Sequence, residues 1–377
     1  MMSWNPGWCG VFLALLLVGA ADSSAEKLFR QWDRNKDGRL VESELPGAAR
    51  RNFRRVDTNR DGFISLAEHV AFLTGRPRLP EGVKGIYDVD YVGDKNPRQR
   101  LDIFLPVRRP VDKPLPVLAY IHGGGWENGD KRDGLGRVAG FVEGGRYIGV
   151  TIGYRLSGEA RWPAQIHDCK AAIRWLKANA DRFGMDPERI AVYGHSAGGH
   201  LVAMLGVSGG VKQLEGSLGQ HTKLDSRVAA VIDFCGPTDF LRMNDFPSRI
   251  DHDAATSPES RLVGGAIQEH PDRCRNASPL TFVSPDDAPF LVVHGTRDEL
   301  VAYNQSELLR TSLERARVPV ALLTITRGGH GLGGPVLDAR VRAFLEHHFY
   351  QRGVAAKHES LSSGALKRRQ PRPQKSP

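Results

Sequence analysis

The fold of this 377-residue chain is limited most tightly by a glycine-rich turn at 194–199, Gly194-His195-Ser196-Ala197-Gly198-Gly199. A strand-like run, 189–193, precedes the turn, and a helix-like run, 201–206, follows it. In this strand–turn–helix context, a G-x-S-x-G turn lifts the serine hydroxyl above the edge of a sheet. Gly194 and Gly198 are expected because a Cβ there would collide with the neighbouring strand and helix. We interpret Ser196 as a nucleophile. The alternative is a glycine-rich turn without chemistry.

The sequence around this turn alternates between strand-like and helix-like runs. Strands are expected at 86–92, 100–105, 116–122, 148–154, 228–234, 290–294 and 320–325, and helices at 163–183, 303–315 and 336–349. Repeated strand-then-helix order predicts an α/β fold with a mostly parallel central sheet and helices on both faces. Segment 236–284 is rich in Pro, Asp and Ser and is expected to form a cap or long loops.

The partners of Ser196 are expected later in the chain. A serine needs a base, and the base needs an orienting carboxylate, in the order Ser, Asp or Glu, His for this architecture. Asp298 follows the strand 290–294, and His330 lies in a glycine loop after the strand 320–325. Asp286 and Asp287 precede their strand and are weaker candidates. His294, on a strand, is expected to be packed or structural.

A second glycine run, His122-Gly123-Gly124-Gly125-Trp126, ends the strand 116–122. Backbone amides can approach a substrate closely where side chains are absent, so Gly124 and Gly125, with Ala197 after the nucleophile, are expected to form an oxyanion hole. A phosphate loop or a plain turn is the alternative. No Gly-Lys-Ser/Thr pattern follows the run, which argues against a nucleotide.

Two loops near the N-terminus match the calcium-loop pattern D-x-[DN]-x-[DN]-G-x5-E in full. Calcium takes six to eight oxygen ligands, and this spacing supplies them from side chains and one carbonyl as the loop winds around the ion. Position 8 is apolar in both loops (Leu40 and Ile64), which predicts that the loops pair. The expected ligands are Asp33, Asn35, Asp37, the Arg39 carbonyl and Glu44 in the first loop, and Asp57, Asn59, Asp61, the Phe63 carbonyl, Ser65 and Glu68 in the second.

Residues 26–75 resemble the EF-hand family. The interval between the loops is short, and Pro46-Gly47 interrupts the helix that should leave the first loop, so the connecting helices must be abbreviated, somewhat as in dockerin modules. A structural calcium module, or a module that docks a protein partner, is therefore expected rather than a conformational sensor.

The chain begins with a short apolar run at 11–20, followed by small residues, which predicts a signal peptide over 1–25 and a secreted or periplasmic protein with no stable membrane span after cleavage. An uncleaved N-terminal anchor is the alternative. We expect an EF-hand pair at 26–75, a linker at 76–85, an α/β catalytic domain at 86–352 and a disordered basic tail at 353–377. That tail carries five of the nine net positive charges, so the charge does not indicate a nucleic-acid partner. Cys235 and Cys274 could form a disulfide.

Residues 83–350 resemble the α/β-hydrolase esterase and lipase family, in its hormone-sensitive-lipase-like and carbohydrate-esterase branch. The motifs that carry the resemblance are HGGGW (122–126), GYRLS (153–157), WPAQIHDCKAAIRWL (162–176), GHSAGG (194–199), HGTRDELV (294–301) and GGHG (328–331). The resemblance implies ester hydrolysis through an acyl-enzyme by Ser196, His330 and Asp298, with no catalytic cofactor.

The substrate is less restricted by these motifs. Secretion and a calcium module favour acetyl or feruloyl esters of carbohydrates, either small molecules or polysaccharides. The chemical alternatives are a lipase, an arylformamidase-like hydrolase and a prolyl-oligopeptidase-type peptidase. Peptidases of the last type carry a large N-terminal propeller domain, which the 50 residues of the calcium-loop region cannot replace. A calcium-dependent docking protein with a vestigial hydrolase domain is the alternative of a different class.

Overall fold

The computed structural model describes residues 20–110 and 113–367. The chain divides into two compact units, Met1–Pro80 and Glu81–Pro377, and the boundary falls inside the predicted linker. Most of the predicted signal peptide lies outside the described residues, and its end forms the start of helix α1. In the described part, no helix is both long and apolar enough to cross a membrane.

The N-terminal unit is built from short elements around two loops. They are α1 (Ala20–Trp32), β1 (Arg39–Leu40), η1 (Glu42–Glu44), α2 (Gly47–Arg50), α3 (Phe53–Val56), β2 (Ile64–Ser65) and α4 (Leu66–Thr74). Leu40 and Ile64 face each other in the antiparallel β1–β2 pair and are fully buried with Phe29, as the apolar position 8 predicts. The helix that leaves the first loop is a single 3-10 turn that stops before Pro46, so the expected abbreviation is present.

The second unit contains a nine-stranded sheet in the order β11-β10-β9-β8-β7-β5-β6-β4-β3. Its strands are β3 (Val83–Asp90), β4 (Arg100–Pro106), β5 (Leu115–Ile121), β6 (Ile148–Ile152), β7 (Met185–His195), β8 (Ala230–Phe234), β9 (Phe290–Gly295), β10 (Val320–Thr326) and β11 (Glu359–Ser362). All pairs from β6 to β11 are parallel, and β3 and β4 add an antiparallel edge. The central strands β5, β6 and β8 are buried along their whole length, as continuous apolar runs predict.

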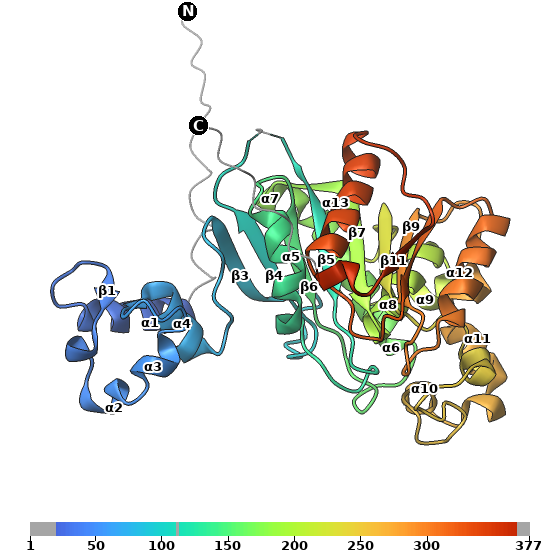
Figure 1. Cartoon of the computed structure of the whole chain (residues 1–377), viewed down its shortest axis with the longest axis horizontal. Coiled ribbons are helices and arrows are strands. Elements are labelled where there is room, and N and C mark those ends of the chain that lie inside the picture. The colour runs from blue at the N-terminus through green and yellow to red at the C-terminus, as the bar shows by residue number, and fades with distance from the viewer. Residues whose placement is uncertain (1–19, 111–112, 368–377) are drawn as a thin grey trace, which may run out of the picture. The chain divides into compact units, whose positions relative to one another are not determined.

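Helices cover both faces of this sheet (Figure 1). On one face, α5 (Leu135–Val142) and α13 (Pro335–Tyr350) lie side by side, where Arg342 donates to the Gly140 carbonyl at 2.9 Å. On the other face lie α6 (Ala164–Ala178), α8 (Ala197–Val207) and α12 (Asn304–Arg315), and α6 packs against α8. Shorter helices of this unit include η2 (Lys131–Gly134), which leads directly into α5, and α7 (Ala180–Phe183) and α9 (Lys212–Glu215). The predicted α/β-hydrolase fold is therefore confirmed.

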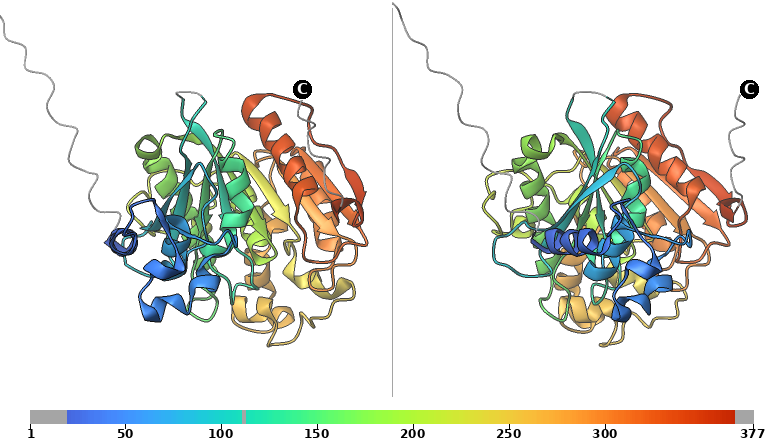
Figure 2. Two further views of the ribbon diagram at one scale, coloured as in Figure 1. Left: turned by 60° about the vertical axis from the view of Figure 1, so that its left-hand side comes forward. Right: turned by 90° about the vertical axis from the view of Figure 1, so that its left-hand side faces the viewer.

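The predicted cap, 236–284, is a series of short helices. They are η3 (Phe240–Asp245), α10 (Pro258–Val263), η4 (Ile267–Glu269), α11 (Pro271–Ala277) and η5 (Pro279–Phe282). Figure 2 shows α10 and α11 together at the bottom of both views, at the ends of the strands. No long apolar lid helix occurs in this described segment.

Two predicted boundaries and the predicted tail need correction. The first strand begins at Val83 rather than 86, and the helix expected over 163–183 breaks at Asn179 into α6 and α7. The tail was expected to be disordered from 353, but β11 pairs in parallel with β10, and η6 (Ala365–Lys367) follows it. An edge strand pairs on one side only, so its polar sequence gives little signal. It is fixed by Arg340 of α13, which donates to both Glu359 carboxylate oxygens at 2.7 Å.

Candidate active site

Ser196 lies at the turn between β7 and α8, with φ 59° and ψ −125°, a conformation that L-residues rarely adopt. The glycines around it leave no room for a side chain. A Cβ at Gly194 would overlap the Gly198 carbonyl, and a Cβ at Gly198 would overlap the carbonyls of Ile121 and His122. The close packing of β5, β7 and α8 therefore requires both glycines, and it holds the serine in its strained position.

Asp298 and His330 come together from two loops that follow neighbouring strands. His330 Nδ1 donates to Asp298 Oδ2 at 2.7 Å, which leaves Nε2 available to accept a proton. Asp298 also accepts from the amides of Leu300 and Val301, at 2.9 and 3.0 Å. Burial alone would raise the pKa of the Asp298 carboxyl, but hydrogen bonds from His294 and His330 outweigh it and hold that pKa well below its ordinary value. Asp298 is therefore a permanently charged partner for an imidazolium.

The weaker carboxylate candidates lie elsewhere. Asp286 and Asp287 precede β9, at the opposite end of that strand from Asp298, and both accept a hydrogen bond from the Ser284 hydroxyl at 2.7 and 2.8 Å. Asp286 also pairs with Arg227 at 3.0 Å. Neither aspartate contacts a histidine in the described part of the chain.

The loop of His330 is attached to the nucleophile turn through its backbone. His195, the residue before Ser196, donates from Nε2 to the His330 carbonyl at 2.7 Å, and the two rings are 4.7 Å apart between centroids. Burial, followed by the positive charge that His330 acquires, lowers the pKa of His195 to about 4, so this side chain is neutral at physiological pH. Within the described structure the Ser196 hydroxyl makes no hydrogen bond, either to the His330 ring or to another residue. Such contacts often tighten only when substrate binds.

The predicted oxyanion loop lies directly beside Ser196. A Cβ at Gly123 would come within 3.3 Å of the Ser196 Cβ, and Gly124 and Gly125 take φ values of 110° and 60°. The amides of Gly124, Gly125 and Ala197 donate to no backbone carbonyl among the described residues. Three free donors beside a strained serine are the arrangement that a developing oxyanion requires. The Tyr154 ring stacks on that of His122, and its hydroxyl donates to the His122 carbonyl at 3.0 Å. These contacts fix the start of the predicted oxyanion loop.

Two histidines near the site have a part in it that the sequence does not predict, although His294 was expected to be packed or structural. His294, on β9, is fully buried and places Nε2 3.1 Å from Asp298 Oδ2 and 2.9 Å from the Val301 carbonyl. Because both of those partners accept, Nε2 carries the proton, and the Ser306 hydroxyl donates to Nδ1 at 2.7 Å. His294 is thus a second donor to the Asp298 carboxylate. Its sequence signal is its position four residues before Asp298, on the preceding strand.

His200 connects three parts of the site. Trp126 of the oxyanion loop donates to His200 Nδ1 at 3.2 Å, and His200 Nε2 donates to the Ala277 carbonyl of α11 at 2.6 Å. Burial lowers the pKa of His200 to about 4, so it stays neutral and can accept from the indole. The oxyanion loop, the nucleophile helix and the cap are therefore joined through one side chain, and the sequence signal was the histidine that directly follows GHSAGG.

The three cysteines in the described part of the chain take no part in a disulfide. Cys169, Cys235 and Cys274 are free and buried, so the bridge considered between Cys235 and Cys274 is not formed. Cys235 lies behind the catalytic loops, with Sγ 3.7 Å from the Val293 carbonyl and 3.8 Å from the His330 carbonyl. Burial raises the pKa of its thiol well above the ordinary value, which keeps it protonated and unreactive.

In the N-terminal unit, the carboxylates at positions 1 and 12 of each loop turn inward. Asp33 accepts from the amides of Asp37 and Gly38 at 3.2 and 2.9 Å, and Glu44 accepts from those of Arg34 and Val41 at 3.1 and 3.0 Å. The second loop repeats this pattern around Asp57 and Glu68, with Asn59 and Asp61 in the places of Asn35 and Asp37.

The buried acids of these loops fit a cation. Asp33, Glu44 and Asp57 are buried and form no ion pair among the described residues, and a buried carboxylate without a cation is costly. Glu68 pairs with Arg78 at 3.4 Å. The Ser65 hydroxyl donates to Glu68 at 2.8 Å and caps α4, so a ligand role for it would need that bond to open.

Comparison with known proteins places these features in a family context. The sequence model of the BD-FAE family matches residues 101–313, and that of the EF hand matches residues 51–70, which contain the whole second calcium loop. Among curated relatives, Esterase LipC of Mycobacterium tuberculosis is 34% identical over 63% of this chain and 57% of its own length. The probable carboxylic ester hydrolase LipM of the same organism is 33% identical over 74% of this chain and 63% of its own length.

The chain thus spans about three fifths of the length of these two relatives. Among solved structures, a truncated form of a carbohydrate esterase from gut microbiota is 32% identical, with a TM-score of 0.66. The match covers 72% of this chain and 98% of that one.

Proposed function

Because the chain belongs to the BD-FAE family of α/β-hydrolase esterases, we propose that it is a serine esterase that cleaves acetyl or feruloyl esters of carbohydrates through an acyl-enzyme. The observation that carries this proposal is the Asp298–His330 pair, 2.7 Å apart, whose loop is attached beside a serine held at φ 59°. The carbohydrate part of the proposal draws on the similarity to a carbohydrate esterase.

Each side chain then has one task in the reaction. The Ser196 hydroxyl attacks the ester carbonyl while His330 Nε2 takes its proton, and Asp298 stabilises the imidazolium through Nδ1. The amides of Gly124, Gly125 and Ala197 donate to the oxyanion. His330 returns the proton to the leaving alcohol, and water then attacks the acyl-enzyme by the same route in reverse.

The N-terminal unit is proposed to hold calcium as a structural ion. Asp33, Asn35, Asp37, the Arg39 carbonyl and Glu44 would bind one ion, and Asp57, Asn59, Asp61, the Phe63 carbonyl and Glu68 a second, with Ser65 direct or through water. The ion would neutralise the buried carboxylates and fix the loops. It supplies no chemistry to the hydrolysis. The N-terminal apolar run supports secretion as part of the same proposal.

The test compares the wild type with Ser196→Ala on p-nitrophenyl acetate, on feruloyl and acetyl esters of xylan oligosaccharides, and on long-chain triglycerides. We expect hydrolysis of the short and carbohydrate esters by the wild type and near-background rates for the variant. Equal, near-background rates for both proteins on every substrate would favour the vestigial-hydrolase alternative. Preference for the triglycerides would favour a lipase.

A further inference from the structure

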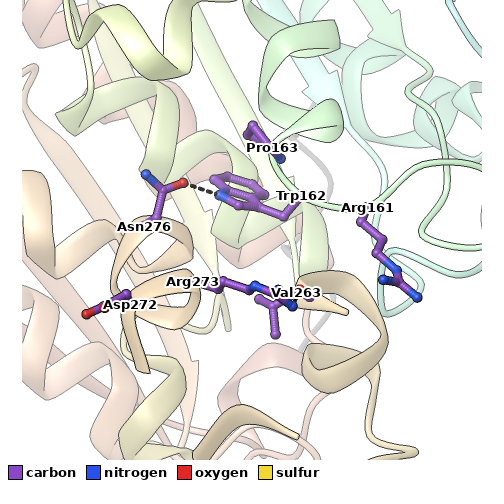
Figure 3. Close-up of a pocket in the computed structure, with 7 residues that line it drawn as sticks. All are labelled: Arg161, Trp162, Pro163, Val263, Asp272, Arg273 and Asn276. Atoms are coloured by element: carbon purple, nitrogen blue, oxygen red, sulfur yellow. Dashed lines mark hydrogen bonds between the residues drawn. The ribbon is translucent and has the colours of Figure 1, made fainter. Parts of the chain in front are cut away.

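A pocket of about 540 Å³ opens beside the cap and does not include the catalytic residues. It lies between the start of α6 and the cap helices α10 and α11 (Figure 3). Its lining combines two arginines, an aromatic ring, an amide and two apolar side chains, with one carboxylate: Arg161, Trp162, Pro163, Val263, Asp272, Arg273 and Asn276. Mixed apolar and convergent polar linings of this size are typical of ligand sites.

The positive charge of this pocket is not balanced within the described structure. The Arg161 guanidinium forms no hydrogen bond or ion pair among the described residues, and it lies against Gly264, where a Cβ would meet Nη1 at 2.8 Å. Among the described residues, the Arg273 guanidinium donates only to the carbonyls of Val263 and Gly264, at 3.4 and 3.2 Å. The only carboxylate of the lining, Asp272, is 95% exposed and pairs with Arg275 at 2.7 Å. Both arginine side chains lie against the Gly264 backbone, one beside its Cα and one at its carbonyl, and neither positive charge is neutralised by a carboxylate of the lining, so an anion bound beside either guanidinium would be stabilised.

The rest of the lining suits a sugar ring. Trp162 donates from Nε1 to Asn276 Oδ1 at 2.8 Å, which leaves both amide hydrogens of Asn276 without a partner among the described residues and free to bind hydroxyl groups. Trp162, Pro163 and Val263 add apolar surface, against which the C–H face of a sugar packs. An apolar wall with a few fixed polar groups is the combination that orients an amphipathic ligand.

Contacts connect this pocket with the active site. The Trp162 ring lies 5.4 Å from that of His200, whose amide donates to the Ser196 carbonyl at 3.0 Å. Helix α10, whose last residue Val263 lines the pocket, begins at Pro258. The Pro258 side chain lies within contact distance of a Cβ placed on Gly125 of the predicted oxyanion loop. Val263 is five residues further along α10, or roughly 8 Å at the rise of a helix. A neighbouring residue of the sugar chain whose ester lies at Ser196 can bridge that distance.

We propose that this pocket binds the carboxylate of a uronic acid, so that the enzyme prefers esterified polysaccharides that carry acidic side groups. The inference rests on the proposed esterase function and adds a substrate class to it. The planar fork of an arginine matches a carboxylate through two parallel hydrogen bonds. Asp272 at the rim disfavours a doubly charged phosphate more than a singly charged uronate.

The experiment measures selectivity. The kcat/KM is determined for acetylated xylan oligosaccharides with and without glucuronate side groups, for the wild type and for Arg161→Gln, Arg273→Gln and the double variant. Arg352→Gln, an exposed arginine after α13, serves as the control for net charge. We expect the acidic-over-neutral ratio to fall roughly tenfold in the double variant, mainly through KM, which is the effect of one charge-assisted hydrogen bond. The ratio should be unchanged in the control.

A second measurement uses the wild type alone and so does not depend on the folding of a variant. Free D-glucuronate should inhibit hydrolysis of the acidic substrate at concentrations where D-glucose does not. An equal ratio in the wild type and the double variant, or equal inhibition by the two sugars, would overturn the uronate site. Absence of hydrolysis on every ester would instead refute the esterase proposal.

Discussion

The most quantitative prediction concerns Asp233, a carboxylate on β8 that lies under the nucleophile turn. It is fully buried, its Oδ1 accepts from the Gly236 amide at 2.9 Å, and its Oδ2 has no partner in the described structure. Burial raises the pKa of its carboxyl from 3.8 to about 6. The folded protein therefore keeps this proton over a pH range in which the unfolded chain has lost it.

The sign and size of the effect follow from that difference. The protonated Asp233 carboxyl contributes fully to the free energy of unfolding below about pH 4, and this contribution is lost as the pH rises through 6. At about 1.4 kcal/mol per pKa unit, the complete change is about 3 kcal/mol, and about 2 kcal/mol of it falls between pH 4.5 and 7.5. In Asp233→Asn the contribution is absent at every pH, while the bond from the Gly236 amide can still form.

The assay is urea unfolding of the wild type and Asp233→Asn at fixed calcium concentration, from pH 4.5 to 7.5. Relative to the wild type, the variant should gain about 2 kcal/mol of unfolding free energy across that range. Asp286→Asn, at an exposed carboxylate, is the control and should follow the pH dependence of the wild type. Parallel curves for the wild type and Asp233→Asn would refute the assignment of a buried, protonated Asp233.

Three further predictions address the active site and the calcium loops. Ser196→Ala should reduce kcat on p-nitrophenyl acetate to background, and Asp298→Asn should reduce it by roughly 10⁴-fold because the imidazole loses the partner that orients it. His294→Leu should lower kcat roughly tenfold with little change in KM, because Asp298 loses one charge-assisted hydrogen bond, and His294→Gln should restore part of the rate. Chelation of calcium should lower the melting temperature of the N-terminal unit before the hydrolysis rate falls, and Glu44→Gln and Glu68→Gln should each weaken calcium binding roughly tenfold or more.

Each of these predictions has an outcome that contradicts it. Substantial activity in Ser196→Ala would exclude an acyl-enzyme on that residue. An unchanged kcat in a folded His294→Leu protein would show that the hydrogen bond from His294 to Asp298 does not contribute to the rate. Rapid inactivation by the chelator without any change in circular dichroism or melting would give calcium a catalytic role.

The parts of the site that sequence predicts are those fixed by local backbone geometry. Gly194 and Gly198 predict the turn because no larger residue fits between the packed strands and helix. The parallel order of the strands predicts that Asp298 and His330, which follow neighbouring strands, lie at the same edge of the sheet. The calcium loops are predicted in the same way, because their six carboxylates lie at fixed short spacings in the sequence. The apolar residue at position 8 of each loop also predicts that Leu40 and Ile64 face each other.

The parts that sequence misses depend on residues far apart in the chain. The bond from His195 to the His330 carbonyl joins positions 135 residues apart, and nothing in either local pattern indicates it. The same holds for His200, whose acceptor Ala277 lies in the cap. Strand β11 was missed because its stability comes from β10 and from Arg340, while its own composition is that of a polar tail.

The attachment of the His330 backbone to His195 has a consequence for the speed of the reaction. Since the main chain of this segment is anchored at the His330 carbonyl, we expect the proton relay with Ser196 to form by rotation of side chains about their own bonds. Such rotations take picoseconds to nanoseconds, whereas closing a mobile segment over a substrate takes microseconds or longer. We therefore expect turnover of the proposed esterase to be limited by bond making or by product release, and not by assembly of the relay.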